Sequence, residues 1–359
     1  MTNQEIGVVS QMEAVLVEQV RQAISHRQPL CIRGGGSKAF YGRTCAGETL
    51  DVSGHRGIVA YEPTELVITA RAGTPLSEIE AVLAANNQML SFEPPHFSSH
   101  ATLGGMVASG LSGPRRPWGG SVRDAVLGVK LINGRGEVLR LGGQVMKNVA
   151  GYDVSRLMVG ALGTLGVLLE VSVKVLPRPA CERTLVFENA TGPLPPDLPI
   201  SASLQVDGQR YLRLSASARC VELAAELMGG ADADPAIWTA VREQTLPFFQ
   251  TDLPLWRVSL PAAAPDLDIP GSWLIEWGGA QRWLPTDMPA NLLRQRVAAL
   301  GGHATLFRGH HGSGEVFHPL PPAMLALHRR VKHALDPHGL FNPGRMYAEL
   351  DANTLTQTP

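Results

Sequence analysis

Apolar side chains recur at helical spacing near the start of the chain. Leu16, Val20 and Ile24 are four residues apart and are separated mostly by polar residues. This spacing places them on one face of a helix, so an amphipathic helix is predicted over Met12–His26. A second helix is predicted over Leu76–Asn86, where the preceding Gly-Thr-Pro sequence supplies a start signal.

Between and after these helices the pattern changes to short apolar or alternating runs, which are typical of strands. The runs in the first half of the chain are Pro29–Ile32, Thr49–Val52, Gly57–Glu62, Leu66–Ala72, Ala125–Ile132, Glu137–Leu141 and Val167–Leu176. The turn sequence Asn133-Gly134 predicts that 125–132 and 137–141 form a hairpin. The mixture of helices and strands places the chain in the α+β class.

A change of composition divides the chain. A proline-rich connection follows the strand that ends near residue 177, after which two strands are predicted within Ser201–Ser215 and a helix over Cys220–Met228. We therefore expect one domain over residues 1–178 and a smaller α+β domain over 179–335. Residues 336–350 are rich in turns but retain large apolar side chains, so this segment is expected to dock on another part of the protein. Residues 351–359 are polar and are expected to be disordered.

Composition narrows the classes of function. The 359 residues carry a net charge of −1, so the sequence favours neither nucleic acid nor an anionic membrane surface as a partner. The chain contains no apolar run of membrane-spanning length and no secretory signal pattern, so we expect no membrane anchor. The four cysteines are scattered, without the short spacings of iron–sulfur ligands. They are expected to be reduced, in a cytoplasmic protein that carries no cluster of its own.

The sequence RGGGSK at Arg33–Lys38 is the first motif with clear chemistry. Three glycines after a strand permit positive φ angles and a close approach of the backbone to a ligand. Successive backbone N–H groups in such a turn can bind an anion, and Arg33, Ser37 and Lys38 add donors. The order of residues fits neither the P-loop nor the dinucleotide fingerprint. We therefore predict a pyrophosphate-binding turn of another kind, called the cradle below.

Three longer motifs follow the cradle. They are EPPHFSSHATLGGMVASGLSG at 93–113, SVRDAVLGVKLINGRGEVLRLGG at 121–143 and KNVAGYDVSRLMVGALGTLGVLLEVSVKVLP at 147–177. This order resembles the flavoproteins of the vanillyl-alcohol oxidase / p-cresol methylhydroxylase (PCMH) type, most closely the smaller flavin-binding subunits of bacterial glycolate oxidases. The resemblance covers residues 10–177 strongly and returns at NPGRMY near the C-terminus. It implies a two-lobed FAD-binding domain, a cap domain, and a C-terminal segment that returns to the FAD domain.

The resemblance also implies which residues bind FAD, without a covalent link. The cradle would hold the pyrophosphate, the segment from Thr102 would line the flavin and diphosphate, and the GTLG turn would contact the adenosine and diphosphate region. Arg345 would approach the flavin from the C-terminal segment. The complete set is Arg33, Gly34, Gly35, Gly36, Ser37, Lys38, Thr102, Leu103, Gly104, Gly105, Ser109, Gly110, Gly160, Gly163, Thr164, Gly166, Val167 and Arg345.

The histidine motifs of catalytic relatives that oxidise D-2-hydroxy acids are absent from the cap, so the sequence assigns no catalytic residue and no metal. The nearest histidine-rich piece contains His310, His311 and His318, whose role stays open. A substrate-binding arginine could be Arg308, Arg282 or the pair 115–116, and nothing in the sequence chooses among them.

The resemblance implies an FAD-dependent oxidoreductase that serves as a subunit of a glycolate oxidase, or glycolate dehydrogenase, complex. That complex would oxidise glycolate, a small 2-hydroxy acid, to glyoxylate with a larger catalytic flavoprotein subunit and an iron–sulfur subunit. The missing cap motifs favour an accessory or relay flavin over an independent catalyst. The alternatives are a stand-alone FAD-dependent oxidoreductase for a 2-hydroxy acid or alcohol, and a non-catalytic scaffold. A cytoplasmic location is expected, and contact with the inner face of the membrane through the complex stays open.

Overall fold

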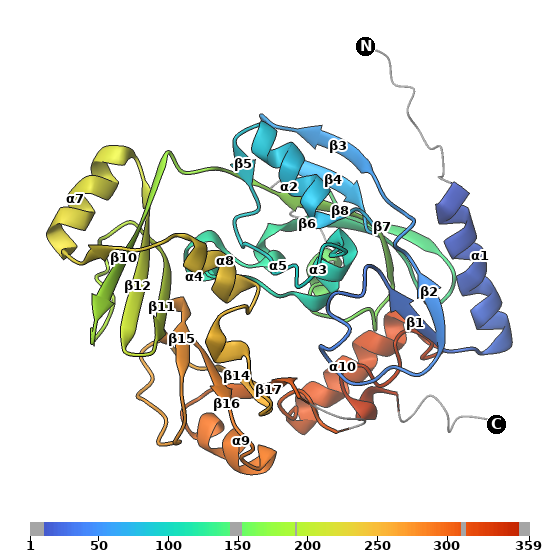
Figure 1. Cartoon of the computed structure of the whole chain (residues 1–359). Coiled ribbons are helices and arrows are strands. Elements are labelled where there is room, and N and C mark those ends of the chain that lie inside the picture. The colour runs from blue at the N-terminus through green and yellow to red at the C-terminus, as the bar shows by residue number, and fades with distance from the viewer. Residues whose placement is uncertain (1–10, 144–152, 191, 310–313, 352–359) are drawn as a thin grey trace.

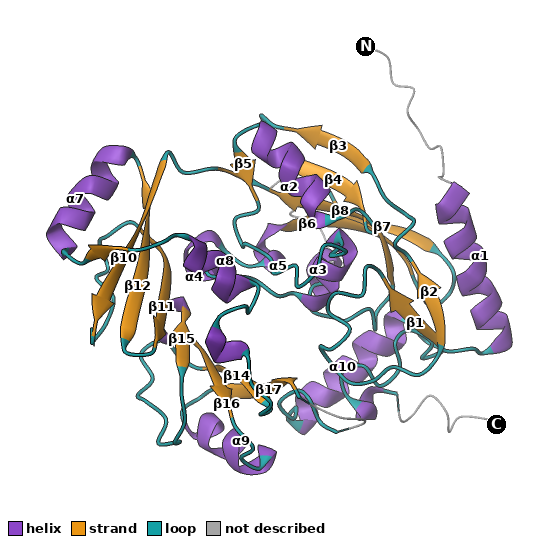
Figure 2. Ribbon diagram, viewed as in Figure 1, coloured by secondary structure: helices purple, strands orange, loops and turns teal. Residues whose placement is uncertain are grey.

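The computed structural model describes residues 11–143, 153–190, 192–309 and 314–351. The chain forms two lobes that lie side by side, with the N-terminal helix at one end of the molecule (Figure 1). Strands and helices are mixed in both lobes, as predicted for the α+β class (Figure 2). None of the helices in the described ranges is long and apolar enough to cross a membrane.

The first lobe contains a five-stranded antiparallel sheet. Its order is β3-β4-β8-β6-β7, with bounds Ile58–Glu62, Val67–Arg71, Val167–Lys174, Val126–Ile132 and Val138–Gly142. The other strands are the parallel pair β1 (Leu30–Arg33) and β2 (Glu48–Asp51) and the antiparallel pair β5 (Gln88–Met89) and β9 (Leu176–Pro177). The helices are α1 (Gln11–His26), α2 (Leu76–Ala85), α3 (Leu103–Ser109), α4 (Arg116–Gly119), α5 (Val122–Ala125) and α6 (Val154–Leu157).

Both faces of this sheet are covered, which explains the apolar run of β8. On one face α2, α3 and α5 contribute to a core that includes Leu76, Met106 and Val171. On the other face α1, β1 and β2 contribute to a second core around Leu16 and Phe341. The central strand β8 is therefore buried along nearly its whole length. The helical and hairpin predictions from periodicity are confirmed within two residues at their ends.

The second lobe is built on one eight-stranded antiparallel sheet. Its order is β13-β10-β12-β11-β15-β16-β14-β17, with bounds Ala231–Asp232, Cys181–Glu188, Gln209–Ala216, Ile200–Val206, Leu274–Glu276, Gln281–Pro285, Leu255–Ser259 and His303–Arg308. Its helices are α7 (Ala218–Met228), α8 (Ala236–Arg242), α9 (Ala290–Ala299) and the short turns Pro247–Phe249 and Trp277–Gly279. Helices α7 and α9 each pack against this sheet, in separate apolar clusters.

A shared apolar cluster joins the two lobes. Tyr41 and Leu162 of the first lobe belong to the same buried cluster as Trp238, Trp283 and Phe307 of the second. Much of the tryptophan-rich part of the cap sequence is therefore core rather than exposed surface. The lobes also meet through a network of ion pairs. Arg115 of the first lobe pairs with Glu93 of the same lobe and with Glu182 of the second, and Arg213 of the second lobe pairs with Glu93.

The C-terminal part of the chain lies against the first lobe. Helix α10 (Pro322–Leu335) is followed by a turn, and backbone bonds then join Leu30 to Leu340 and Asn342, so that β1 has a partner on each edge. The short helix Ala348–Leu350 comes next. Asp351, where the disordered tail was expected to begin, is described and its carboxylate accepts a hydrogen bond from the Gly344 N–H at 2.6 Å. The rest of that expected tail, 352–359, lies outside the described residues.

Candidate functional site

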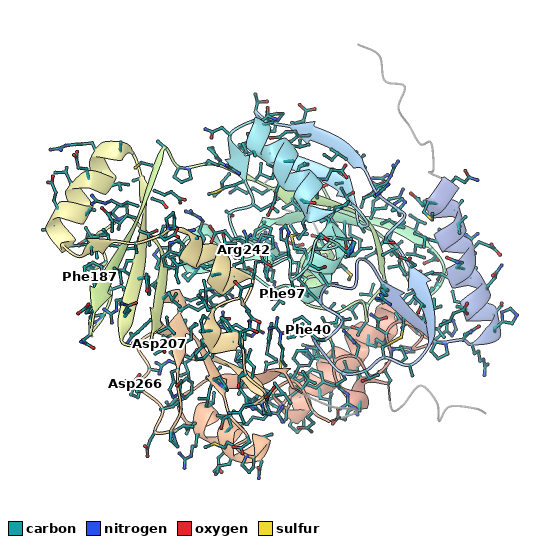
Figure 3. The ribbon with its side chains drawn as sticks, in the orientation of Figure 1. Phe40, Phe97, Phe187, Asp207, Arg242 and Asp266 are labelled. Atoms are coloured by element: carbon teal, nitrogen blue, oxygen red, sulfur yellow. A yellow bond between two sulfur atoms is a disulfide. The ribbon has the colours of Figure 1, made fainter. Side chains whose placement is uncertain are left out.

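A cavity of about 980 Å³ lies at the junction of the lobes. Figure 3 shows Phe40 and Phe97, which line it, between the two lobes in the middle of the molecule. The first lobe, the C-terminal segment and the end of β17 all contribute to its wall. The sequence-predicted site residues that line the cavity are Arg33, Gly34, Gly35, Gly36, Ser37, Lys38, Thr102, Gly105, Ser109 and Arg345.

Four backbone N–H groups of the cradle have no hydrogen-bond acceptor among the described residues. The cradle follows β1 directly, and Gly36 has a φ of +71°, a conformation that L side chains rarely adopt. Within the described part of the chain, no hydrogen bond is donated by the N–H groups of Gly35, Gly36, Ser37 or Lys38. Buried or partly buried amides are normally paired, so a run of free amides along a cavity wall is suited to an anionic ligand.

A short helix faces the cradle. Thr102 is the N-cap of α3, and its hydroxyl accepts a hydrogen bond from the Gly105 N–H at 3.2 Å. The same hydroxyl packs against Gly34, where an added Cβ would come within 2.6 Å of it. Because a hydroxyl can also donate, Thr102 keeps a hydrogen for a ligand in the cavity. Sequence periodicity did not predict α3, because the helix is short and glycine-rich.

The second lobe shapes the wall beside the cradle. The Glu243 carboxylate, at the end of α8, accepts hydrogen bonds from the N–H groups of His96 and Phe97 at 3.1 Å and 2.7 Å. Phe97 has a positive φ of 58°, which is uncommon for a bulky residue and needs such support. The orientation of the Phe97 ring therefore depends on a carboxylate that belongs to the other lobe.

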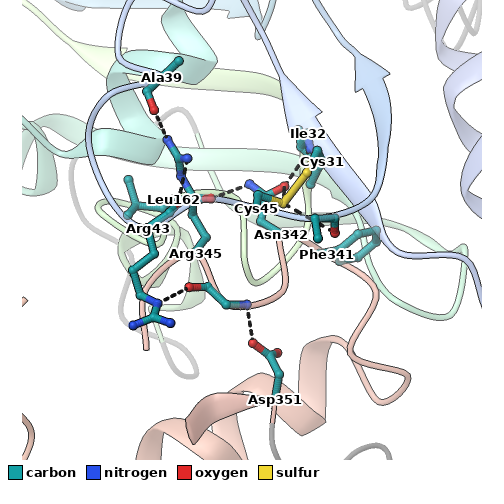
Figure 4. Close-up of a disulfide and its surroundings, with 12 residues drawn as sticks. Cys31, Ile32, Ala39, Arg43, Cys45, Leu162, Phe341, Asn342, Arg345 and Asp351 are labelled. Atoms are coloured by element: carbon teal, nitrogen blue, oxygen red, sulfur yellow. Dashed lines mark hydrogen bonds between the residues drawn. A yellow bond between two sulfur atoms is a disulfide. The ribbon is translucent and has the colours of Figure 1, made fainter. Parts of the chain in front are cut away.

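The C-terminal segment closes the cavity from a third side (Figure 4). The Asn342 side chain accepts a hydrogen bond from the Ile32 N–H and donates one to the Leu162 carbonyl, both at 2.6 Å. The Arg345 guanidinium donates to the backbone carbonyls of Ala39, Tyr41 and Arg43. Arg345 therefore lines the cavity, but its N–H groups are engaged with the loop that follows the cradle.

The remaining predicted site residues lie behind this wall. Gly104 packs against Ala72, Gly110 packs against Gly160, and Gly163 packs against the Asn342 amide. The Thr164 hydroxyl donates to the Ala161 carbonyl at 2.7 Å. Leu103, Gly166 and Val167 likewise do not line the cavity, and from the GTLG region it is Leu162 that does. A direct part for these residues in binding FAD stays a prediction.

Cys31 and Cys45 form a disulfide, which corrects the expectation that all four cysteines are reduced (Figure 4). Their Cα atoms are 6.1 Å apart, within the usual range for such bonds. The pairing of β1 with β2 brings Cys45, which precedes β2, back beside Cys31 in β1. No rule of cysteine spacing predicts this bond from the sequence. The bond closes a loop that contains the entire cradle.

The cavity wall is positively charged. Its described lining includes Arg33, Lys38, Arg308 and Arg345, and no aspartate or glutamate. Burial lowers the pKa of the Lys38 ammonium to about 8, and the charge of Glu243 offsets part of that shift. Cations in a recessed wall without carboxylates attract anions, which again favours a phosphate-bearing ligand.

We expect the Lys38 ammonium to make the affinity for FAD dependent on pH. If Lys38 binds the diphosphate as predicted, it must be protonated to do so, and FAD should raise its pKa on binding. Below pH 8 the free protein already carries this proton, and we expect a flat profile. Above pH 8 the dissociation constant should rise, by at most about tenfold per pH unit. Equilibrium dialysis of the apoprotein with FAD between pH 6.5 and 9 checks this, and a wild-type profile that stays flat would contradict it.

The matched control is Lys38→Arg. Arginine stays protonated over this range, so the variant should show a flat profile. If the variant followed the same rise as the wild type, another group would be responsible for the pH dependence.

The histidine-rich piece shows no metal site in the described ranges. His310 and His311 lie outside the described residues. The His318 ring accepts a hydrogen bond from the Ala304 N–H at 3.4 Å, and its backbone carbonyl accepts one from Tyr347. No group of three potential ligands is found among the residues that the structure describes.

Three residues at the site were not assigned from the sequence. Asn342 stands in the NPGRMY motif, which offered a signal, although its side chain could not be placed from the motif. Glu243 carried no signal, since it follows an ordinary helix. Arg308 was one of several arginines left open, and the structure places it in the cavity wall.

Comparisons with known proteins agree with this geometry. Residues 8–142 match the family described as "FAD binding domain", and residues 288–346 match "FAD linked oxidases, C-terminal domain". The chain is 54% identical over 344 residues to the glycolate oxidase subunit GlcE of Escherichia coli (strain K12), covering 93% of this chain and 97% of that protein. It is 33% identical over 170 residues to the glycolate oxidase subunit GlcD of Bacillus subtilis (strain 168), covering 46% of this chain and 36% of that protein.

A solved structure shares the fold. Alkyldihydroxyacetonephosphate synthase superposes with a TM-score of 0.64 at 14% identity, covering 93% of this chain and 75% of that chain. At this identity the likeness concerns the fold alone.

Proposed function

Because this chain belongs to the family of PCMH-type FAD-binding proteins that includes GlcE, we propose that it is the FAD-binding subunit of a complex that oxidises glycolate to glyoxylate. The family makes it an FAD-dependent oxidoreductase. The similarity to GlcD supports a larger flavoprotein of that kind as its partner. In this proposal the electrons leave through an iron–sulfur subunit.

The free amides of the cradle are the observation that carries the proposal. Four successive N–H groups that have no partner among the described residues lie in the wall of a cationic cavity, beside glycines that leave room for a ligand. The FAD diphosphate is an anion that such a turn can bind. The residues present therefore fit the cofactor.

Each wall has a distinct part in holding FAD. The cradle amides and Lys38 would bind the diphosphate, and Thr102 would donate from the opposite wall. Gly105 and Ser109 would allow close approach along α3. In this proposal the cofactor is held without a covalent link. Bound FAD would supply the electron acceptor for oxidation of the alcohol carbon.

The absorption spectrum of the purified chain tests the proposal. Flavin bands at about 375 and 450 nm are expected after purification or after reconstitution with FAD. Bleaching by glycolate without oxygen, in the chain alone or only once a GlcD-like partner is added, supports the proposed role. A chain that never binds FAD would overturn it. A chain whose flavin is not reduced by glycolate even with the partner would overturn the substrate assignment.

A further inference from the structure

Arg308 brings a positive charge from the second lobe into the cavity. It is the last residue of β17, and its guanidinium carbon lies 4.7 Å from the centre of the Phe40 ring and 5.2 Å from that of Phe97. A third ring, that of Phe307, lies 5.8 Å away. Stacking on aromatic faces holds a guanidinium in place while leaving its edge N–H groups available.

The Arg308 guanidinium has no hydrogen-bond or ion-pair partner among the described residues. The other arginines that the sequence left open are engaged elsewhere. Arg115 pairs with Glu93 and Glu182, and Arg282 donates to Asp266 and to several backbone carbonyls. Arg116 stacks on Trp277 at 4.6 Å and does not line the cavity. The structure therefore singles out Arg308.

The cations of the cavity wall come from different sides, and Arg308 is on the side away from the cradle, where it can bind a second anion. The cradle already supplies Arg33, Lys38 and its free amides to a diphosphate on the side of the first lobe. Arg308 stands on the other lobe, and both it and Lys38 lie against the Phe97 ring, 5.2 Å and 5.7 Å from the ring centre. Burial lowers the pKa of Arg308, because desolvation disfavours the charged form, and a bound anion would relieve that cost.

We propose that Arg308 anchors the carboxylate of a small 2-hydroxy acid, held between the second lobe and the cradle. This inference rests on the proposed function and adds to it, since it assigns a substrate-binding residue to this chain rather than to a partner subunit. A planar guanidinium with a fixed fork of N–H donors matches a carboxylate in a two-pronged contact. Phe40 and Phe97 position the fork and exclude water from one of its faces. Arg308 would thus bind and orient the acid.

Calorimetric titration of the FAD-loaded chain with oxalate tests the proposal, because oxalate presents a carboxylate and is not turned over as an alcohol. We expect oxalate to bind the wild type. In Arg308→Gln the dissociation constant should rise by about tenfold to a hundredfold, the usual effect of losing a charged hydrogen-bond pair. Arg308→Lys should restore part of the affinity, because it keeps the charge but loses the fork. The 450 nm absorbance should show unchanged FAD content in all variants.

Arg219→Gln is the matched control, since Arg219 is an exposed arginine on α7 of the same lobe. It should bind oxalate as the wild type does. Equal oxalate affinity in the wild type and Arg308→Gln would overturn the proposal. Loss of FAD from Arg308→Gln with oxalate binding retained would also overturn it, and would make Arg308 a cofactor contact. A wild type that holds FAD but binds no oxalate would overturn this inference alone, whereas a wild type without FAD would overturn the proposed function as well.

Discussion

Replacing Gly35 with alanine is expected to lower the affinity of the chain for FAD by about tenfold to a hundredfold. A Cβ at this position would lie 1.4 Å from the carbonyl oxygen of His100 and 2.5 Å from its carbonyl carbon. Both are backbone atoms, so no side-chain rotation can relieve the clash. The cradle and the segment before α3 must separate, and the strain of such overpacking is commonly about 1–3 kcal/mol or more. Equilibrium dialysis with FAD, together with thermal unfolding, measures the two consequences.

The matched control is Gly54→Ala. Its added Cβ would meet only the end of the flexible Met12 side chain, at 3.0 Å, so FAD affinity and thermal stability should stay close to those of the wild type. Gly35→Ala with undiminished FAD affinity would show that the two glycine-rich walls need not stay in contact to bind the cofactor.

Replacing Lys332 with methionine is expected to lower the free energy of unfolding by about 3–5 kcal/mol. The Lys332 ammonium is buried and donates to the Asp336 carboxylate at 2.7 Å and to the carbonyls of Thr164 and Phe341 at 2.8 and 2.9 Å. Methionine would leave the fully buried Asp336 charge without its cation and two carbonyls without a donor. Denaturant unfolding of the wild type and variant measures the loss.

A second variant separates charge burial from packing. Lys332→Met with Asp336→Asn removes both charges, so it should recover part of the stability that the single change loses. Arg219→Met, which breaks an exposed pair with Glu222, should change the free energy of unfolding by no more than about 1 kcal/mol. If Lys332→Met were as mild as Arg219→Met, the buried pair would not be what fixes the C-terminal segment.

Local patterns predicted the parts of the fold that local forces determine. The periodic apolar positions of α1 and the Asn-Gly turn between β6 and β7 each specify an element from neighbouring residues alone. The glycines of the cradle predicted a turn that permits close backbone approach, but an ordinary strand-to-helix loop explained them equally well until the later motifs were considered. The fold class could therefore be predicted before any contact was known.

The contacts that complete the site could not be predicted in this way. Phe97 is supported by Glu243, which is 146 residues away in the sequence, and no local pattern connects the two. The Cys31–Cys45 bond depends on how β1 pairs with β2 rather than on cysteine spacing. Arg308 differs from Arg115 and Arg282 in having no hydrogen-bond or ion-pair partner among the described residues while it lines the cavity, and that combination exists only once the second lobe has folded against the first.

Because β1 pairs with the C-terminal segment, this part of the site can form only late in the synthesis of the chain. The Ile32 N–H is bonded to the Asn342 side chain, 310 residues later in the chain. At about 5–20 residues per second, the ribosome would need about 15–60 s to travel that distance. Throughout that interval the nascent chain would expose an unpaired strand edge beside the cradle, which is a site for aberrant association. The cofactor pocket is therefore completed only after residue 342 has been synthesised, and a chain that stops before that residue would lack one wall of it.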